Sequence, residues 1–182
     1  MNNWNRMFKP IVVLCIICVV ITGALAATNS VTAPIIEEAT RLAQEQARQE
    51  LLPEASGFTK VEDVSVENVS DVYTADNGVG TVITCSGKGY SSTITVMVAF
   101  TPDGTIKQIK VTSQGETQGV GTKVTTQPTA FWDQFAGKAA QTLTLGVDVD
   151  KITGASISSR AVTNAVNAAI DAYNEISGKA GV

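Results

Sequence analysis

The chain has 182 residues, 44% of them hydrophobic, which is enough for one globular domain with a real core and a terminal appendage. Its formal net charge of −4 and its pI near 4.8 argue against a nucleic-acid partner, since no basic stripe exists to replace phosphate counterions. The absence of histidine excludes imidazole acid–base chemistry and the commonest metal ligand, so we expect no catalytic residue and no metal site in this chain.

The N-terminal part contains an apolar run that is suited to a membrane. Residues 11–27 carry no charge and consist mainly of Ile, Val, Leu and Ala, and with its flanks this run nearly crosses a hydrocarbon core of about 30 Å. Arg6 and Lys9 precede the run, and Glu37 and Glu38 follow it. This charge distribution predicts a single-pass protein with its N-terminus in the cytoplasm and its domain on the outer face of the cytoplasmic (inner) membrane.

A cleaved signal peptide is the alternative to a retained anchor, because residues 24–26, Ala-Leu-Ala, resemble a small-x-small cleavage site. We favour retention because the apolar run is long for a signal sequence. Cys15 and Cys18 lie within the run and are interpreted as small apolar residues in lipid rather than as a metal or redox pair. Cys85 is alone in the soluble part, so no intrachain disulfide framework is expected there.

A second helical pattern follows the anchor. Apolar residues recur at helical spacing over residues 34–52, with Glu, Arg and Gln between them, and Pro53 ends the pattern. The predicted organisation is a cytoplasmic N-terminus and transmembrane anchor over residues 1–28, a connecting helix over 29–56 and an extracytoplasmic domain over 57–182.

Segments rich in Val, Thr, Ile and Tyr come next and predict an antiparallel sheet. Strict alternation is clearest over residues 94–100, and the pattern over 106–111 slips once, as at a β-bulge. The Thr-Pro-Asp-Gly turn at 101–104 predicts a hairpin between the last two strands. The glycines near 78 and 87–89 are interpreted as ordinary turn residues. The predicted strands cover residues 61–75, 79–86, 91–100 and 105–113.

The loop over residues 114–121 has too many glycines for a strand and no helical period. Its glycines would let the backbone approach a flat ligand closely, and Glu116, Thr117 and Gln118 would supply a few directed hydrogen bonds. An ordinary connecting loop is the alternative.

An aromatic cluster and a short apolar segment lie between this loop and the C-terminal helix. Phe131, Trp132 and Phe135 fall at helical spacing and are interpreted as core residues, with direct stacking on a cofactor as the alternative. Residues 143–146 predict a short strand and turn.

The C-terminal segment begins with a polar loop, residues 150–159, and continues as an apolar-periodic run from Ala161 to Ile176. The spacing predicts an amphipathic helix whose N-cap is Ser158 or Ser159. Helix starts leave backbone N–H groups without partners and favour a phosphate. From these residues alone, a polar turn that merely caps the helix is the simpler alternative.

Residues 150–166, Asp-Lys-Ile-Thr-Gly-Ala-Ser-Ile-Ser-Ser-Arg-Ala-Val-Thr-Asn-Ala-Val, closely resemble the flavinylation segment of the FMN-binding domain family. That family includes the G subunits of Rnf ferredoxin–NAD oxidoreductase complexes and the C subunits of sodium-pumping NADH–quinone reductases, and the short chain favours the former. Its members carry FMN through a phosphoester on the last hydroxyl of an Asp-x-x-(Ser/Thr)-Gly-Ala-(Thr/Ser) pattern, installed by a dedicated flavin transferase. The resemblance implies that Ser156 carries covalent FMN, with Thr153 as the alternative hydroxyl.

A second motif of the same family, usually His-x-Glu-Thr-Pro-Gly-Leu-Gly, resembles residues 114–121. Gln114 replaces the histidine, so no role of that histidine is carried over, and Gln118 replaces the proline, so we expect a less rigid loop. The cofactor-binding residues that the two motifs imply are Thr153, Gly154, Ala155, Ser156, Glu116, Thr117, Gln118, Gly119, Val120 and Gly121.

The expected fold is α+β, with an N-terminal transmembrane helix followed by one domain that has an antiparallel sheet flanked by helices. The resemblance implies a membrane-anchored electron-transfer flavoprotein, not catalytic on its own, that works with the other membrane subunits of an Rnf-type complex. Such a complex, a translocase, transfers electrons from ferredoxin to NAD and couples this to export of Na+ or H+. A stand-alone extracytoplasmic flavoprotein reductase and a non-redox membrane-anchored binding or assembly module are the alternatives.

Overall fold

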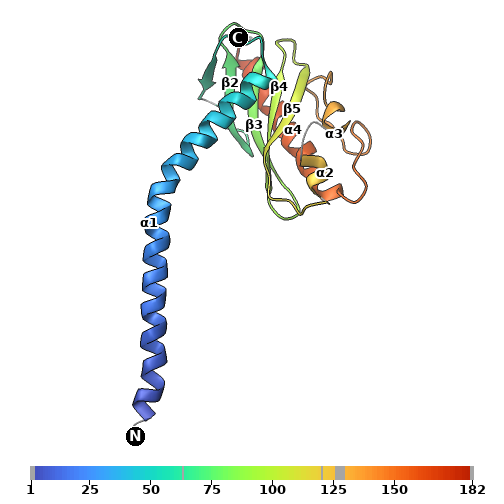
Figure 1. Ribbon diagram of the computed structural model, residues 1–182. Coiled ribbons are helices and arrows are strands. Elements are labelled where there is room, and N and C mark those ends of the chain that lie inside the picture. The colour runs from blue at the N-terminus through green and yellow to red at the C-terminus, as the bar shows by residue number, and fades with distance from the viewer. Residues whose placement is uncertain (1–2, 63, 120, 126–129, 181–182) are drawn as a thin grey trace. The chain divides into compact units, whose positions relative to one another are not determined.

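The computed structural model describes residues 3–62, 64–119, 121–125 and 130–180. The chain divides into two compact units, Met1–Ala43 and Gln44–Val182. It combines helices with one antiparallel sheet, so the α+β prediction is confirmed (Figure 1). The elements in chain order are α1 (Asn3–Leu51), β1 (Phe58–Val61), β2 (Val69–Ala75), β3 (Thr81–Lys88), β4 (Thr93–Phe100), β5 (Ile106–Ser113), α2 (Thr122–Thr125), α3 (Ala130–Asp133) and α4 (Ser156–Ala180).

The first unit is the N-terminal part of helix α1, and it is long and apolar enough to cross a membrane. An 18-residue window within Phe8–Leu51 has a mean hydropathy of 2.8, and the large apolar side chains of this part, such as Leu14 and Val19, are exposed. The helix continues through Pro34 to Leu51, so the predicted anchor and connecting helix form one element. It ends before Pro53, because the residue that precedes a proline is disfavoured in helical conformation.

The second unit has three layers with the sheet in the middle. The strand order is β1-β2-β3-β4-β5 and every neighbouring pair is antiparallel. Alternate residues of the central strand β4 point to opposite faces: Val96 and Val98 pack with helix α4, whereas Met97 and Ala99 pack with the end of α1. Helix α4 therefore covers one face of the sheet and residues 44–52 cover the other (Figure 1).

Strands β4 and β5 form the predicted hairpin. The Thr101 N–H donates to the Thr105 carbonyl oxygen at 2.9 Å across the turn. Phe100 pairs with Ile106, whereas the preceding residue pairs with Gln108, so β5 has one extra residue at this point. This is the slip that the interrupted alternation predicted, and it has the pairing of a β-bulge.

The predicted strand over residues 61–75 differs from the structure. The segment contains the end of β1, a loop and β2 rather than one strand. Val64 and Val66 in the loop are partly buried against the core. The alternation of apolar residues there reflects burial of loop side chains and not strand pairing, which a one-dimensional pattern does not distinguish.

The segment between α3 and α4 is irregular, and the strand predicted over residues 143–146 is wrong. The backbone N–H and carbonyl of Leu143 bond to the side-chain amide of Asn167 on α4, at 2.8 and 2.9 Å, instead of to another strand. Within the described residues, its strand-like pairing consists of two isolated bridges, one between Leu145 and Val149 and one between Ala139 and Thr105, just before β5. The predicted aromatic core cluster, in α3 and the turn after it, is buried and therefore confirmed.

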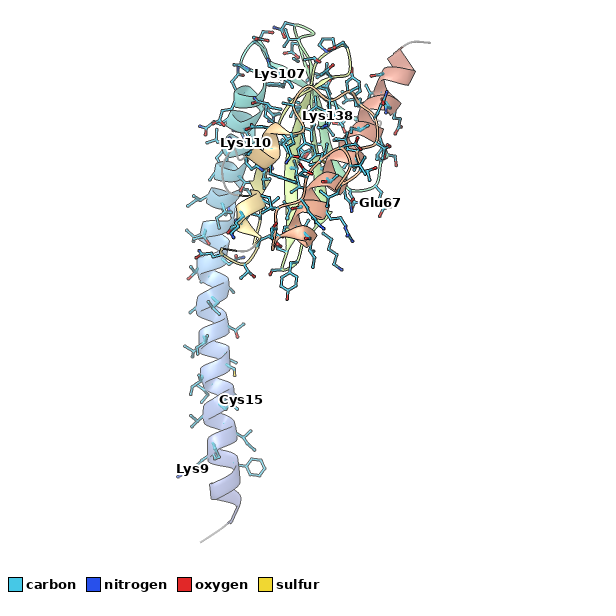
Figure 2. The ribbon with its side chains drawn as sticks, turned by 90° about the vertical axis from the view of Figure 1, so that its right-hand side faces the viewer. Lys9, Cys15, Glu67, Lys107, Lys110 and Lys138 are labelled. Atoms are coloured by element: carbon cyan, nitrogen blue, oxygen red, sulfur yellow. The ribbon has the colours of Figure 1, made fainter. Side chains whose placement is uncertain are left out.

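The last turn of α1 is fixed to the edge strand β5 by polar contacts. Gln108 Nε2 donates to the carbonyl oxygens of the last two residues of α1, both at 3.1 Å, which satisfies two helix C-terminal acceptors. Figure 2 labels Lys107 and Lys110, both of which belong to β5. Lys110 pairs with Glu50, and Lys107 Nζ lies 3.1 Å from Glu54 Oε2. Exposed ion pairs contribute about 0–1 kcal/mol each, so burial of the apolar side chains of this turn contributes most of the attachment.

At one end of the sheet a buried carboxylate joins three segments that are distant in the sequence. Glu116 follows β5 and is only 6% exposed. Its Oε1 accepts from the backbone N–H groups of Ser91 and Ser92, at 3.0 and 3.2 Å. Its Oε2 accepts from the Tyr90 N–H at 3.3 Å and from Ser158 Oγ at 2.5 Å. One side chain thus braces the β3–β4 turn, the loop after β5 and the first turn of α4.

The surroundings of this brace leave no space for larger residues. A Cβ atom at Gly89 would lie 2.5 Å from one carboxylate oxygen of Glu116, and one at Gly121 would lie 2.4 Å from the other. Gly87 has the same restriction toward α4, because a Cβ there would lie 2.0 Å from the Ala161 carbonyl oxygen. These glycines are required by close approach of neighbouring segments.

Replacing Glu116 by Gln tests the brace. The substitution puts an NH2 group where one oxygen accepted hydrogen bonds, so at least one backbone N–H of the turn loses its acceptor. The loss costs about 1–2 kcal/mol, which lowers the unfolding midpoint of the full chain in detergent by about 2–8 °C. Glu54→Gln is the matched control, since that side chain is 69% exposed, and it should shift the midpoint less. Equal midpoints for the two variants would contradict the brace.

The same carboxylate predicts that the free energy of unfolding depends on pH. Burial raises the pKa of Glu116, but the hydrogen bonds from Ser158 and from the three backbone N–H groups together lower it below its ordinary value of 4.5. The stabilisation is therefore complete above pH 4.5 and is lost as the pH falls through the folded-state pKa. Between about pH 5 and pH 3, the midpoint of the wild type should fall more steeply than that of Glu116→Gln. Parallel pH profiles would exclude this carboxylate as a cause.

Candidate functional site

A pocket of about 470 Å³ opens beside the Glu116 brace, and its size lies within the usual range of cofactor sites. Its walls come from the β3–β4 turn, the loop after β5 and the start of α4, which are the three segments that the carboxylate holds together. The lining residues are Tyr90, Glu116, Thr117, Gly121, Gly154, Ala155, Ser156, Ile157 and Ser158.

The structure brings the two motifs of the sequence together around this pocket. The predicted residues that line it are Glu116, Thr117 and Gly121 from the first motif and Gly154, Ala155 and Ser156 from the second. Gln118 and Gly119 line a neighbouring hollow of about 570 Å³ instead. Thr153 is exposed and lines neither of these two hollows. Val120 lies outside the described residues.

Helix α4 begins at Ser156, before the predicted N-cap. Its first helical hydrogen bond joins the Ser159 N–H to the Ala155 carbonyl oxygen at 2.8 Å, so the predicted cap at Ser158 or Ser159 is wrong. Ser158 Oγ donates to the buried carboxylate, and Ser159 Oγ accepts from the Ile152 N–H at 3.2 Å. Because both hydroxyls are directed into the protein, neither caps the helix.

This early start places Ser156 at the wall of the pocket, where it is partly exposed. The backbone N–H groups of Ser156, Ile157 and Ser158 precede the first helical hydrogen bond and have no acceptor within the helix. Such groups, together with the positive end of the helix dipole, favour an anion. The Ser156 hydroxyl takes part in none of the hydrogen bonds between described residues, so it is available at this helix start.

The turn before the helix has a local physical reason for its small residues. Gly154 has φ 82°, a left-handed conformation that favours glycine, although a Cβ there would meet no atom within 4 Å. Ala155 is 3% exposed and packs in the core. The Asp150 N–H donates to Gln134 Oε1 at 2.6 Å, and Gln134 Nε2 donates back to the Asp150 carbonyl oxygen at 3.3 Å. The backbone that leads to Ser156 is therefore fixed.

The loop after β5 is also held by its own contacts. Gln114 Oε1 accepts from the Glu116 N–H at 2.7 Å, and the hydroxyls of Thr117 and Ser91 lie 3.0 Å apart. The Gly119 N–H donates to a threonine hydroxyl of α2 at 2.9 Å. The carboxylate of Glu116 thus acts within the protein, where it holds the pocket walls, and any contact with a ligand would be additional.

Sequence reasoning missed three of the lining residues: Tyr90, Ile157 and Ser158. The glycines before Tyr90 suggested an ordinary turn, and Ser158 suggested a helix cap. Tyr90 and Ser158 both donate hydrogen bonds to Glu116, whose charge needs hydrogen-bond donors once the side chain is buried. The sequence does not show that this glutamate is buried or which distant donors it meets.

Cys85 is buried away from the pocket lining. Burial strongly raises the pKa of the Cys85 thiol, which stays protonated and donates to the Val96 carbonyl oxygen at 3.3 Å. Within the described part of the chain, no three His, Cys, Asp or Glu residues lie together as metal ligands would.

Two family models match the chain. Residues 89–171 match the FMN-binding domain, and residues 1–51 match the RnfG N-terminal region. The first range begins at the β3–β4 turn and ends within α4, so it includes every residue that lines the pocket.

Individual proteins are similar over nearly the whole chain. The G subunit of the Na(+)-translocating ferredoxin:NAD(+) oxidoreductase complex of Acetobacterium woodii is 35% identical over 201 residues, covering 96% of this chain and 95% of the relative. The G subunit of the proton-translocating ferredoxin:NAD(+) oxidoreductase complex of Clostridium ljungdahlii is 30% identical, covering 97% of each. Among solved structures, the crystal structure of Shewanella oneidensis NqrC is 30% identical over 63% of each chain, with a TM-score of 0.45. The chain therefore belongs to the RnfG family, the G subunits of ion-translocating oxidoreductase complexes, and contains that family's FMN-binding domain.

Proposed function

We propose that this chain is the electron-transfer subunit of an Rnf-type complex and carries FMN covalently, through a phosphoester on Ser156. The observation that carries the proposal is the position of Ser156, which begins α4 at the wall of the pocket. This residue is also the last hydroxyl of the segment that resembles the flavinylation pattern. Similarity to G subunits over nearly the whole chain supports its place in such a complex.

The residues of the pocket fit the two ends of FMN in different ways. The free N–H groups of residues 156–158 and the positive end of the helix dipole suit a phosphate. The remaining space, within about 470 Å³, is lined mainly by small and uncharged residues, which suits the ribityl chain and the ring. Glu116 is the charged residue of the lining, and its oxygens already accept four hydrogen bonds within the protein.

FMN, when bound, supplies the redox chemistry of this subunit. The residues of the chain have other roles. Ser156 tethers the cofactor, the N–H groups at the start of α4 orient its phosphate, and Glu116 holds the pocket walls in register. No acid–base role follows for Ser156, since no titratable partner contacts its hydroxyl among the described residues.

The proposal extends to the assembly. The names of the similar subunits describe complexes that act on ferredoxin and NAD(+) and move Na+ or protons, and we assign this chain to a complex of that kind. Its partners are the other membrane subunits and, during maturation, a flavin transferase. The apolar helix anchors the chain, with the N-terminus in the cytoplasm and the domain on the outer face, because Arg6 and Lys9 precede the apolar run.

Mass spectrometry of the intact chain, expressed with a flavin transferase, tests the attachment. We expect the wild type to gain the mass of FMN less one water, and Ser156→Ala to lose this gain completely because no ester forms on alanine. Ser156→Thr offers the same nucleophilic oxygen and should keep the gain. Thr153→Ala is the matched control and should also keep it. Retention of covalent flavin by Ser156→Ala together with its loss from Thr153→Ala would move the acceptor to Thr153.

The same preparation distinguishes the two alternative functions. A wild-type chain without flavin, despite the transferase, would favour a non-redox binding or assembly module. A flavinylated chain that purifies from its native membrane without other subunits would favour a stand-alone reductase.

Labelling of intact cells tests the orientation. Lys88 lies exposed at the end of β3, so a membrane-impermeant maleimide should label Lys88→Cys from outside. Asn3→Cys, which precedes the apolar run in the sequence, should be labelled only after lysis. Cys85 is buried and should contribute little background in the folded chain. Labelling of Asn3→Cys from outside, with Lys88→Cys protected, would reverse the proposed topology.

A further inference from the structure

One large aromatic side chain at the pocket is unusually exposed. Tyr90 lines the pocket and is 72% exposed. The other large apolar residue of the lining is Ile157, from α4, which is 52% exposed. The remaining lining residues are small or polar. Covering an exposed aromatic ring gains the free energy of burial, so a flat ligand in this pocket would be stabilised by contact with Tyr90.

The backbone that carries this ring is rigid. The Tyr90 N–H donates to Glu116 Oε2 at 3.3 Å, and the Gly89 N–H donates to the Ser92 carbonyl oxygen at 2.9 Å. The next two backbone N–H groups also donate to the Glu116 carboxylate. The ring can therefore turn only about its side-chain bonds, which reduces the entropy that a stacking contact would cost.

The other aromatic side chains of the domain already pack within the protein, and Phe58 of β1 lies against the apolar cluster at the end of α1. Tyr173 stacks on Phe100 with 4.7 Å between ring centroids, and Tyr73 lies under the guanidinium of Arg48. The aromatic cluster of α3 is buried in the core. Among the described aromatic residues, Tyr90 is the one that lines the pocket.

We propose that Tyr90 is the stacking residue of this site, whose phenol ring lies against the isoalloxazine ring of the FMN tethered at Ser156. This inference rests on the proposed function. Flat aromatic rings prefer offset stacking, and the β3–β4 turn and the start of α4 place Tyr90 and Ser156 in the walls of one pocket. Ile157, the residue after the tether, supplies an apolar contact for the same ring system.

Two fluorescence measurements on the covalently loaded full chain in detergent test the contact. A phenol against a flavin quenches its fluorescence, because the phenol gives an electron to the excited ring and takes it back. Each sample is compared with itself after denaturation, which corrects for flavin content. An aromatic contact of ordinary strength keeps the flavin in the stacked, quenched state most of the time. Tyr90→Ala removes this contact and should therefore raise the fluorescence yield of the native protein about threefold or more. It should also increase quenching by iodide, because the ring face is uncovered.

Tyr90→Phe separates stacking from electron donation. Phenylalanine covers the ring face but does not donate an electron, so the yield should rise while protection from iodide stays as in the wild type. Lys88→Ala is the matched control from the end of β3, just before the turn, since Lys88 is exposed but does not line this pocket. It should change neither measurement.

The outcomes keep the two proposals apart. A flavinylated Tyr90→Ala chain with unchanged yield and unchanged iodide quenching would overturn the stacking role and leave the tether intact. A wild-type chain without covalent flavin would overturn both proposals. Covalent mass retained in every variant, with the yield and the iodide quenching changing as described, would support both.

Discussion

The carboxylate of Glu116 is the interaction on which the rest of the site depends. A buried charge is costly unless hydrogen bonds replace the water it loses, and here four donors do so. They come from positions 24 to 42 residues away along the chain. Positions 89 and 121 have no room for a Cβ atom, because the same carboxylate lies against their backbone. Charge compensation therefore determines which segments meet at this end of the sheet.

The hydrogen bond from Ser158 to Glu116 also determines which serine hydroxyl is free at the pocket. Residues 156, 158 and 159 are all serine, and a generic helix start would use one of them as a cap. Ser158 is bound to the carboxylate and Ser159 to the preceding turn, so both are buried. The helix then starts earlier, and Ser156 is the hydroxyl of this group that lines the pocket without an internal partner. Selection of one serine among three thus follows from a tertiary contact.

Much of the fold follows from periodicity in the sequence, and most of the site does not. The hairpin at 101–104, the bulge in β5 and the end of α1 before Pro53 all depend on local residues, so sequence reasoning predicts them. The loop valines before β2 and the start of α4 depend on what they pack against, and both predictions fail. Ser156 is found through resemblance of a motif. Tyr90 and Ser158 become visible only when the burial of Glu116 is known.

If FMN is bound at Ser156, a covalent tether compensates for the low affinity of an open pocket. An electron carrier needs its ring within reach of a donor and an acceptor, and the two exposed large apolar residues of the lining, Tyr90 and Ile157, lie where such a ring would be accessible. Exposure reduces the apolar area that binding removes from water, so non-covalent affinity falls. A phosphoester removes dependence on that affinity. The structure around Ser156 then needs only to orient the phosphate and one face of the ring, which a short helix start and one aromatic side chain suffice to do.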